Sequence, residues 1–278
     1  MKVGLGSYSY HLAFGKHGFK PESPLTLKQF IYRVKELGLD GFQIDPWHLE
    51  SRDEKYLKEI RKISEEMGLY VELGACGTKP QYLKPMLNAA DILGVKVLRT
   101  FIGAARYSER NPLRRQMEIA VTDLKKLSLI AEEYGIKIAV ENHGDLTSSE
   151  LLQIIKEVHS PHIGVCFDTG FPLAVFEDPV SAAKRLIPYT LTTHFKDCEV
   201  LLTDYGMKIR ETALGKGVID LRSILQIIKK CAPGVNLNIE MTIEACANGR
   251  ESLEYEDRCI RESVEYLKKI LAESKEEG

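Results

Sequence analysis

The hydrophobic positions of this chain fall into a short pattern that recurs along its first half. The pattern consists of the end of an amphipathic helix, a glycine, one aliphatic residue and then an apolar strand. It occurs in KELGLDGFQID at 35–45, EEMGLYVEL at 65–73, DILGVKVLRT at 91–100 and EEYGIKIAVE at 132–141. The glycine is expected to end each helix, because glycine readily adopts the left-handed conformation of a helix C-cap. These glycines are Gly38, Gly68, Gly94 and Gly135.

Capping side chains are expected at the starts of four helices as well. Each is a short polar residue that directly precedes a helical pattern, and such residues satisfy the free backbone N–H groups of the first turn. The expected caps are Thr147 (in a capping box with Glu150), Asn111, Asp178 and Asp220.

Eight apolar segments are predicted as strands, and a helical pattern follows nearly every one. The segments are 3–8, 41–45, 69–74, 97–102, 136–141, 163–168, 190–196 and 236–241. Strands that alternate with helices predict right-handed βαβ units and a parallel sheet. Eight such units in 278 residues match an α/β fold of the (β/α)8 TIM-barrel type, which typically needs about 250 residues. A doubly wound sheet is the rival, but no G-x-G-x-x-G follows the first strand.

One domain is expected over residues 1–278, because no linker or low-complexity segment interrupts the pattern. The unit after the seventh strand is irregular. There, VLLT and MKIRE flank Asp204-Tyr205-Gly206, a plausible hairpin turn. We therefore predict a hairpin insertion at about 198–213, on one face of the barrel.

Four polar residues stand at the ends of consecutive predicted strands, where TIM barrels carry their chemistry. They are Glu141, Asp168, His194 and Glu240. Side-chain alternation turns them away from the bulky aliphatics of their strands, so they are expected to point into the barrel mouth at one level. A single strand-end carboxylate is usually a helix cap, and a lone histidine is usually a core residue. Four of them in phase are much harder to obtain by chance.

Three carboxylates that converge in a barrel mouth would repel one another and shift one another's pKa strongly. A divalent cation removes that problem, so the four residues are predicted metal ligands. Carboxylate oxygens with one imidazole favour Mn²⁺, and Co²⁺, Mg²⁺ and Zn²⁺ are also compatible. The absence of a thiolate from the set is unlike structural zinc.

Amino-acid composition indicates which binding partners and which cellular compartment are compatible with this chain. The net charge of −2 gives no electrostatic footprint for nucleic acid or for an anionic membrane. No apolar run reaches membrane-spanning length, and the N-terminus has no long apolar stretch. Six cysteines without a C-x-x-C pair are typical of free, mostly buried thiols in a reducing cytosol. A cytoplasmic protein is therefore expected.

Five motifs resemble those of the xylose-isomerase-like TIM-barrel superfamily of sugar isomerases and epimerases. They are VENHG (140–144), CFDTG (166–170), THFKD (193–197), LGKGVID (214–220) and NIEM (238–241). The resemblance covers most of the chain and is strongest from 136 to 242. It implies one divalent metal on Glu141, Asp168, His194 and Glu240, with Glu141 and Glu240 as the acid/base pair of the epimerases. It also implies a homo-oligomer, a dimer or a tetramer.

The predicted function is that of a divalent-metal-dependent sugar epimerase or isomerase, which transfers a proton by glutamate through a metal-bound enediolate. The alternative is a metal-dependent lyase of the inosose or 3-dehydroshikimate dehydratase type, and a third is a barrel that binds without turnover. The chain lacks the histidine that many members carry three residues after the aspartate, where Phe171 stands. With seven histidines and no basic track, the endonuclease branch is disfavoured. The candidate contacts to a small sugar or polyol are His143, Lys196, His11, Arg210 and Trp47, each of which has a plain structural alternative in packing or solvation.

Overall fold

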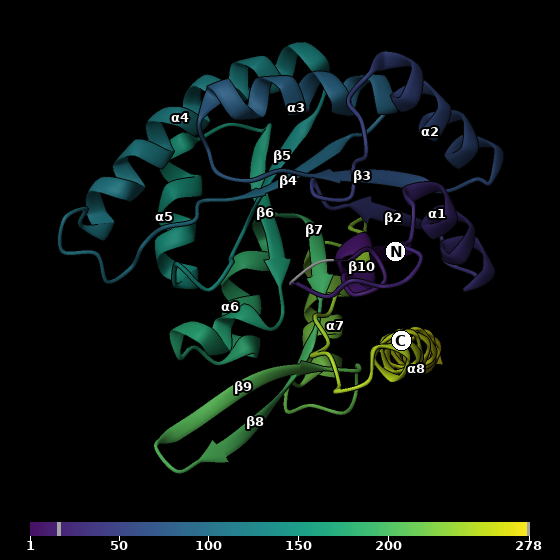
Figure 1. The fold of residues 1–278 in the computed structure, drawn as a ribbon. Coiled ribbons are helices and arrows are strands. Elements are labelled where there is room, and N and C mark those ends of the chain that lie inside the picture. Colours follow the sequence, from purple (N-terminus) through teal and green to yellow (C-terminus); the bar gives the residue numbers. More distant parts are fainter. Residues whose placement is uncertain (16–17, 277–278) are drawn as a thin grey trace.

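The computed structural model describes residues 1–15 and 18–276, and it confirms the predicted TIM barrel. Eight parallel strands close in the order β1-β10-β7-β6-β5-β4-β3-β2 (Figure 1). Their bounds are Val3–Gly6 (β1), Gly41–Ile44 (β2), Tyr70–Gly74 (β3), Val97–Phe101 (β4), Lys137–Glu141 (β5), Ile163–Asp168 (β6), Thr190–Phe195 (β7) and Leu237–Ile239 (β10). Each lies within a predicted segment.

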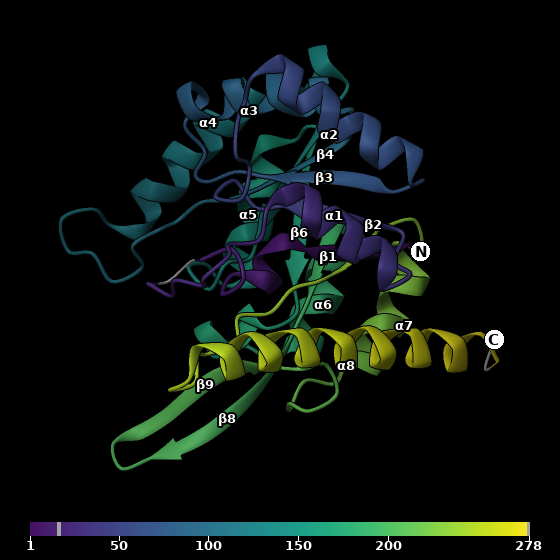
Figure 2. The ribbon, with the colours of Figure 1, turned by 45° about the vertical axis from the view of Figure 1, so that its right-hand side comes forward.

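Helices surround the barrel, and the last one runs along its side (Figure 2). They are Leu27–Glu36 (α1), Glu54–Glu66 (α2), Pro80–Leu93 (α3), Leu113–Tyr134 (α4), Ser148–Val158 (α5), Pro179–Leu186 (α6), Leu221–Cys231 (α7) and Gly249–Glu276 (α8). Single 3-10 turns lie at Ser7–Tyr10 (η1), Phe171–Val175 (η2) and Ile187–Tyr189 (η3). Within residues 1–15 and 18–276, no helix is long and apolar enough to cross a membrane.

Most of the predicted caps are confirmed. Thr147 and Glu150 form the capping box of α5, while Asp178 and Asp220 accept hydrogen bonds from the first turns of α6 and α7. All four predicted C-cap glycines have positive φ. The Asn111 cap is wrong, because α4 begins only at Leu113 and Pro112 occupies the N-cap position.

All six cysteines are free, as expected. Only half of them are buried, however: Cys166, Cys198 and Cys259 lie inside, whereas Cys76, Cys231 and Cys246 are exposed. The prediction of mostly buried thiols is therefore wrong for the second group, whose positions are a βα loop, the end of α7 and the segment before α8. Strand and helix periodicity gives no burial signal in such places.

The barrel interior is unusually polar for a fold whose core is normally filled by branched aliphatic side chains. Glu72 is buried there, and it accepts hydrogen bonds from Thr192 and Asn238 on the opposite side of the barrel. The aliphatic residues of the same strands, such as Ile138 and Ile239, are buried in the hydrophobic core. The polar interior forms a continuous path of side chains that leads to the mouth.

An antiparallel hairpin follows β7. Its strands β8 (Asp197–Thr203) and β9 (Gly206–Thr212) extend away from the barrel in Figure 1. At its base, the carboxylate of Asp197 accepts hydrogen bonds from the backbone N–H groups of Gly215, Gly217 and Ile219. The glycine-lysine-glycine turn at 215–217 is thus held by the chain's own carboxylate.

Candidate metal centre

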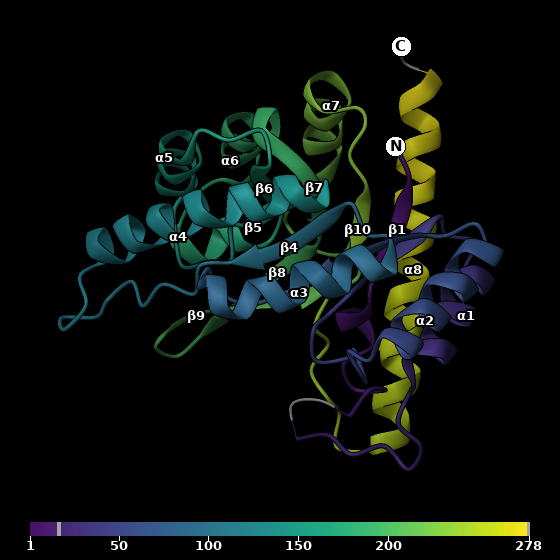
Figure 3. The same cartoon turned by 90° about the horizontal axis from the view of Figure 1, so that it is seen from above.

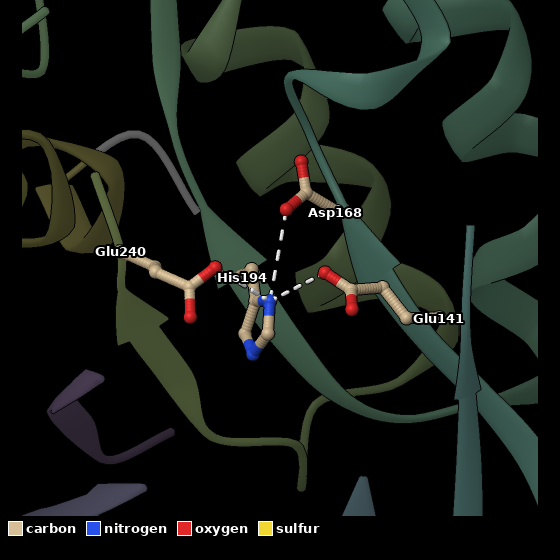
Figure 4. A group of neighbouring side chains, drawn as sticks. All are labelled: Glu141, Asp168, His194 and Glu240. Carbon is tan, nitrogen blue, oxygen red and sulfur yellow. Dashed lines mark hydrogen bonds and ion pairs between the residues drawn. The ribbon is translucent and has the colours of Figure 1, made fainter. Parts of the chain in front are cut away.

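Glu141, Asp168, His194 and Glu240 converge at the barrel mouth. One ligand atom from each lies within 4.8 Å of the others, and all four residues are buried. They come from the C-terminal ends of β5, β6 and β7 and from the residue after β10. The three carboxylates lie around Nδ1 of His194 (Figure 4). That nitrogen lies 2.7 Å from Oε1 of Glu141, 3.0 Å from Oε2 of Glu240 and 3.6 Å from Oδ2 of Asp168. The positions of these residues at the ends of consecutive predicted strands were sufficient to predict this group.

The orientation of the His194 ring is fixed from inside the barrel. Its Nε2 lies 2.8 Å from Oε1 of Gln43, and Nε2 of Gln43 donates to Oε2 of Glu72 at 3.0 Å. Because a carboxylate accepts hydrogen bonds, the amide group of Gln43 must face Glu72 and its oxygen must face the histidine. Nε2 of His194 is then a donor to Gln43, so Nδ1 is the nitrogen that faces the three carboxylates, as a donor while it is protonated and as a metal ligand once that proton is lost.

Asp168 accepts backbone hydrogen bonds through one carboxylate oxygen, and its other oxygen faces the cation of Lys196 at 3.3 Å. Oδ1 accepts hydrogen bonds from the backbone N–H groups of Gly170 and Phe171, at 2.8 and 3.1 Å. Oδ2 is buried and accepts no hydrogen bond within the described part of the chain. Asn142 exchanges two hydrogen bonds with the backbone of Asp168, which locks β5 to β6 below the centre. Asn142 therefore positions a ligand-bearing strand.

These observations fit a divalent metal ion. A buried carboxylate oxygen that accepts no hydrogen bond, and an imidazole nitrogen that faces three carboxylates and can lose its proton, are the donors that such an ion requires. Glu141 also has a buried oxygen, Oε2, that accepts no hydrogen bond from the described residues, although it pairs with a cation.

That cation is Arg99, which is not among the site residues predicted from the sequence. It lies on β4, is 5% exposed, and places Nε 3.0 Å from Oε2 of Glu141 and Nη2 4.0 Å from Oε1 of Glu240. A guanidinium ion therefore contacts both predicted catalytic glutamates. A charged residue inside an otherwise apolar predicted strand was the available signal, since burial of arginine requires a partner.

Lys196 supplies a second buried cation. Its Nζ lies 2.9 Å from Oε2 of Glu240, 3.3 Å from Oδ2 of Asp168 and 3.3 Å from Oε1 of Glu211 on the hairpin. Burial alone would lower the pKa of Lys196, but Asp168, Glu211 and Glu240 outweigh it and raise that pKa. The predicted substrate contact at Lys196 thus lies beside the four proposed ligands.

The carboxylates of the centre are held in their charged form. Burial alone would raise the pKa of Glu141, but Arg99 and His194 outweigh it and lower that pKa to about 2. In Glu240, His194 and Lys196 likewise overcome burial and lower the pKa well below its usual range. Burial would lower the pKa of His194, and the charges of Cys166, Glu240 and Glu141 raise it instead. In the absence of a metal ion, the imidazolium therefore neutralises the carboxylates.

The other four predicted substrate contacts have different surroundings. The ring of His143 stacks on Phe101 with centroids 4.2 Å apart. His11 is buried beside Glu256 of α8, with Nδ1 3.4 Å from Oε1. Arg210 pairs with Glu199 and Glu244 instead of the mouth residues, and Trp47 is 68% exposed on the wall of a neighbouring cavity. Of these five residues, Lys196 pairs with two of the proposed ligands, Asp168 and Glu240.

A TIM barrel with three carboxylates and an imidazole at its C-terminal mouth defines a candidate metal centre. The chain belongs to a family with this fold: residues 31–270 match the model of the xylose isomerase-like TIM barrel family. This confirms the resemblance inferred from the motifs.

The chain is similar over nearly its whole length to several known proteins. It is 24% identical to 3-oxo-isoapionate decarboxylase of Pectobacterium atrosepticum over 96% of this chain and 95% of the relative. D-psicose 3-epimerase from Clostridium cellulolyticum H10 with D-tagatose has a TM-score of 0.74 at 16% identity, covering 98% of this chain and 99% of that one. IolI with a bound zinc atom has a TM-score of 0.71 at 19% identity, covering 95% and 98%. The two solved structures show the fold alone.

Proposed function

We propose that Glu141, Asp168, His194 and Glu240 bind one divalent metal ion, with Mn²⁺ as the first choice. Two observations support this assignment: Oδ2 of Asp168 is buried and accepts no hydrogen bond from the described residues, and Gln43 orients His194. When bound, such an ion acts as a Lewis acid that polarises a carbonyl and acidifies the neighbouring C–H. The substrate class is a small polyhydroxylated carbonyl compound.

We propose proton transfer on that compound as the reaction, which makes the protein a sugar epimerase or isomerase. The observation that carries this proposal is the placement of two glutamates around one point, Oε1 of Glu141 and Oε2 of Glu240, 2.7 and 3.0 Å from the same nitrogen. One ionised glutamate removes the proton beside the carbonyl, and the other, once it has taken up a proton from solvent, returns that proton from its own side. Arg99, which contacts both carboxylates, holds them in place.

The test is a screen of ketoses, aldoses and keto-inositols with Mn²⁺ in D₂O, followed by NMR. The proposal predicts that deuterium enters recovered substrate at the carbon beside the carbonyl. Glu240→Gln should abolish this exchange and leave the circular dichroism spectrum unchanged. Glu244→Gln is the matched control, because Glu244 is half exposed and pairs with the hairpin. Full exchange by Glu240→Gln would show that the acid/base assignment is wrong.

Decarboxylation of a 3-oxo sugar acid is a second candidate, and the two buried cations favour it. Arg99 and Lys196 flank the proposed ligands, and a carboxylate-bearing substrate would be attracted to such cations. The C–C bond to the carboxylate breaks and CO₂ leaves. The electron pair of that bond forms the C=C bond of an enolate whose negative charge lies on the 3-oxo oxygen, and a proton then takes the place of CO₂ on the carbon. The relative named 3-oxo-isoapionate decarboxylase supports this candidate.

Product mass separates the candidates. Decarboxylation removes CO₂, the dehydratase alternative removes one water, and isomerisation leaves the mass unchanged. Lys196→Met should weaken the binding of a sugar acid far more than that of a neutral ketose if the lysine binds a carboxylate. Equal effects on both would argue against decarboxylation. A cytoplasmic homo-oligomer without nucleic-acid or membrane partners stays our expectation.

A further inference from the structure

A cavity of about 930 Å³ adjoins the barrel mouth on the side of β2, β3 and β4. Its walls come from the loops after these strands and from α3 and α4, which run side by side in Figure 3. A cavity of this size accommodates a drug-sized ligand, whereas a single sugar is considerably smaller. The proposed centre therefore has more space beside it than a simple sugar would fill.

The cavity walls are mainly apolar and aromatic. Trp47, Tyr82 and Ile119 line it, and they are 68%, 60% and 46% exposed, respectively. Leu83 and Met86 of α3 form its floor and are buried. Apolar surface of this kind, gathered in one concave place, is typical of a binding site and not of a solvated face.

Phe101 connects the cavity to the proposed metal centre. Phe101 lines the cavity, and its backbone pairs with Glu141 on the neighbouring strand. The guanidinium carbon of Arg99 lies over the Phe101 ring, 5.5 Å from the ring centroid. Ala75, another wall residue, donates its backbone N–H to the carbonyl oxygen of Arg99 at 2.7 Å. Phe101 is therefore adjacent to both the cavity and the proposed centre.

We propose that the cavity binds an apolar, ring-sized substituent of the substrate while the polyhydroxylated end of the same molecule lies at the metal centre. The substrate class is then a sugar or sugar derivative that carries an aromatic or similarly apolar group. This inference rests on the proposed function, because it takes the metal centre as the place of the sugar end. Aromatic walls favour an aromatic guest, since stacked or edge-to-face rings gain energy beyond their buried area.

Trp47 offers a direct readout, because it is the one tryptophan in the sequence. We would titrate the protein with phenyl β-D-glucopyranoside and with methyl β-D-glucopyranoside and follow the tryptophan fluorescence. The two probes share the sugar and differ in the apolar group. The phenyl compound should give a saturable change and bind at least about tenfold more tightly, because it buries more apolar surface.

Two variants on one helix control for the location. Ile119→Asp places a charge in the cavity wall and should abolish the response to the phenyl compound. Leu129→Asp, on the same helix but outside the cavity and 64% exposed, should leave the response unchanged. Tyr82→Asp serves as a second wall variant if circular dichroism shows that Ile119→Asp does not fold.

Equal affinity for the two probes, or no saturable response to either, would overturn the inference. So would light scattering that shows an oligomer which Ile119→Asp dissociates, because the cavity would then be an interface between copies of the chain. Parallel titrations with Mn²⁺ separate the two proposals. Tight phenyl binding without any Mn²⁺ binding would refute the metal centre and keep the cavity, whereas Mn²⁺-dependent turnover with equal probe affinities would do the reverse.

Discussion

Gln43 is predicted to control metal affinity without touching the metal. In Gln43→Leu, a buried side chain of similar size loses both its acceptor to His194, 2.8 Å away, and its donor to Glu72, 3.0 Å away. The imidazole then has no partner that selects the tautomer with a free Nδ1. Loss of such an outer hydrogen bond typically weakens metal binding 10- to 100-fold, which corresponds to about 1.4–2.7 kcal/mol.

The assay is a calorimetric titration of Mn²⁺ into metal-free wild type and variant. Thr192→Val is the matched control, because Thr192 donates to the same Glu72 carboxylate at 2.8 Å but forms no hydrogen bond with the His194 side chain within the described part of the chain. The control should lose stability and keep metal affinity within about twofold. An unchanged Mn²⁺ affinity in Gln43→Leu would refute the orienting role of Gln43.

Two further predictions concern the stability of the fold, and a third concerns metal binding. Burial raises the pKa of Glu256 from 4.5 to about 7. Between these pH values the folded state therefore holds a proton that the unfolded state releases. The free energy of unfolding should fall by up to about 3 kcal/mol as pH rises from about 4.5 to 7. Denaturant unfolding across this range should show a larger fall in wild type than in Glu256→Gln, in which Asp45, whose pKa burial raises to about 6, still contributes. Leu57→Ala, in a fully buried position of α2, should cost about 2–5 kcal/mol of unfolding free energy in the same assay and leave Mn²⁺ affinity unchanged. Because the pKa of His194 is raised without metal, Mn²⁺ binding should release a proton and weaken at acid pH, which titration in two buffers of different ionisation enthalpy would detect.

The sequence predicted the barrel and the four mouth residues because both depend on periodicity. A period of one βα unit sets where each strand ends, and alternation along the strand sets which side chain points inward. Glu141, Asp168 and His194 therefore follow from position alone. The resemblance in motifs added their proposed roles.

Contacts across the barrel could not be predicted in the same way. Gln43, Glu72 and Arg99 lie on β2, β3 and β4, far in sequence from the residues that they support. Which inward side chains meet depends on strand tilt and side-chain length, and periodicity contains neither. The cavity beside Trp47 likewise depends on the packing of α3 against α4. The start of α4 was misplaced because proline at N-cap and proline at N1 look the same in a sequence.

The most direct test of the central claim is anomalous X-ray diffraction from crystals soaked in Mn²⁺. We expect one strong anomalous peak bounded by Glu141, Asp168, His194 and Glu240, and we expect this peak to be lost in Asp168→Asn. A fully occupied peak elsewhere, or an unchanged peak in Asp168→Asn, would contradict the proposed metal centre.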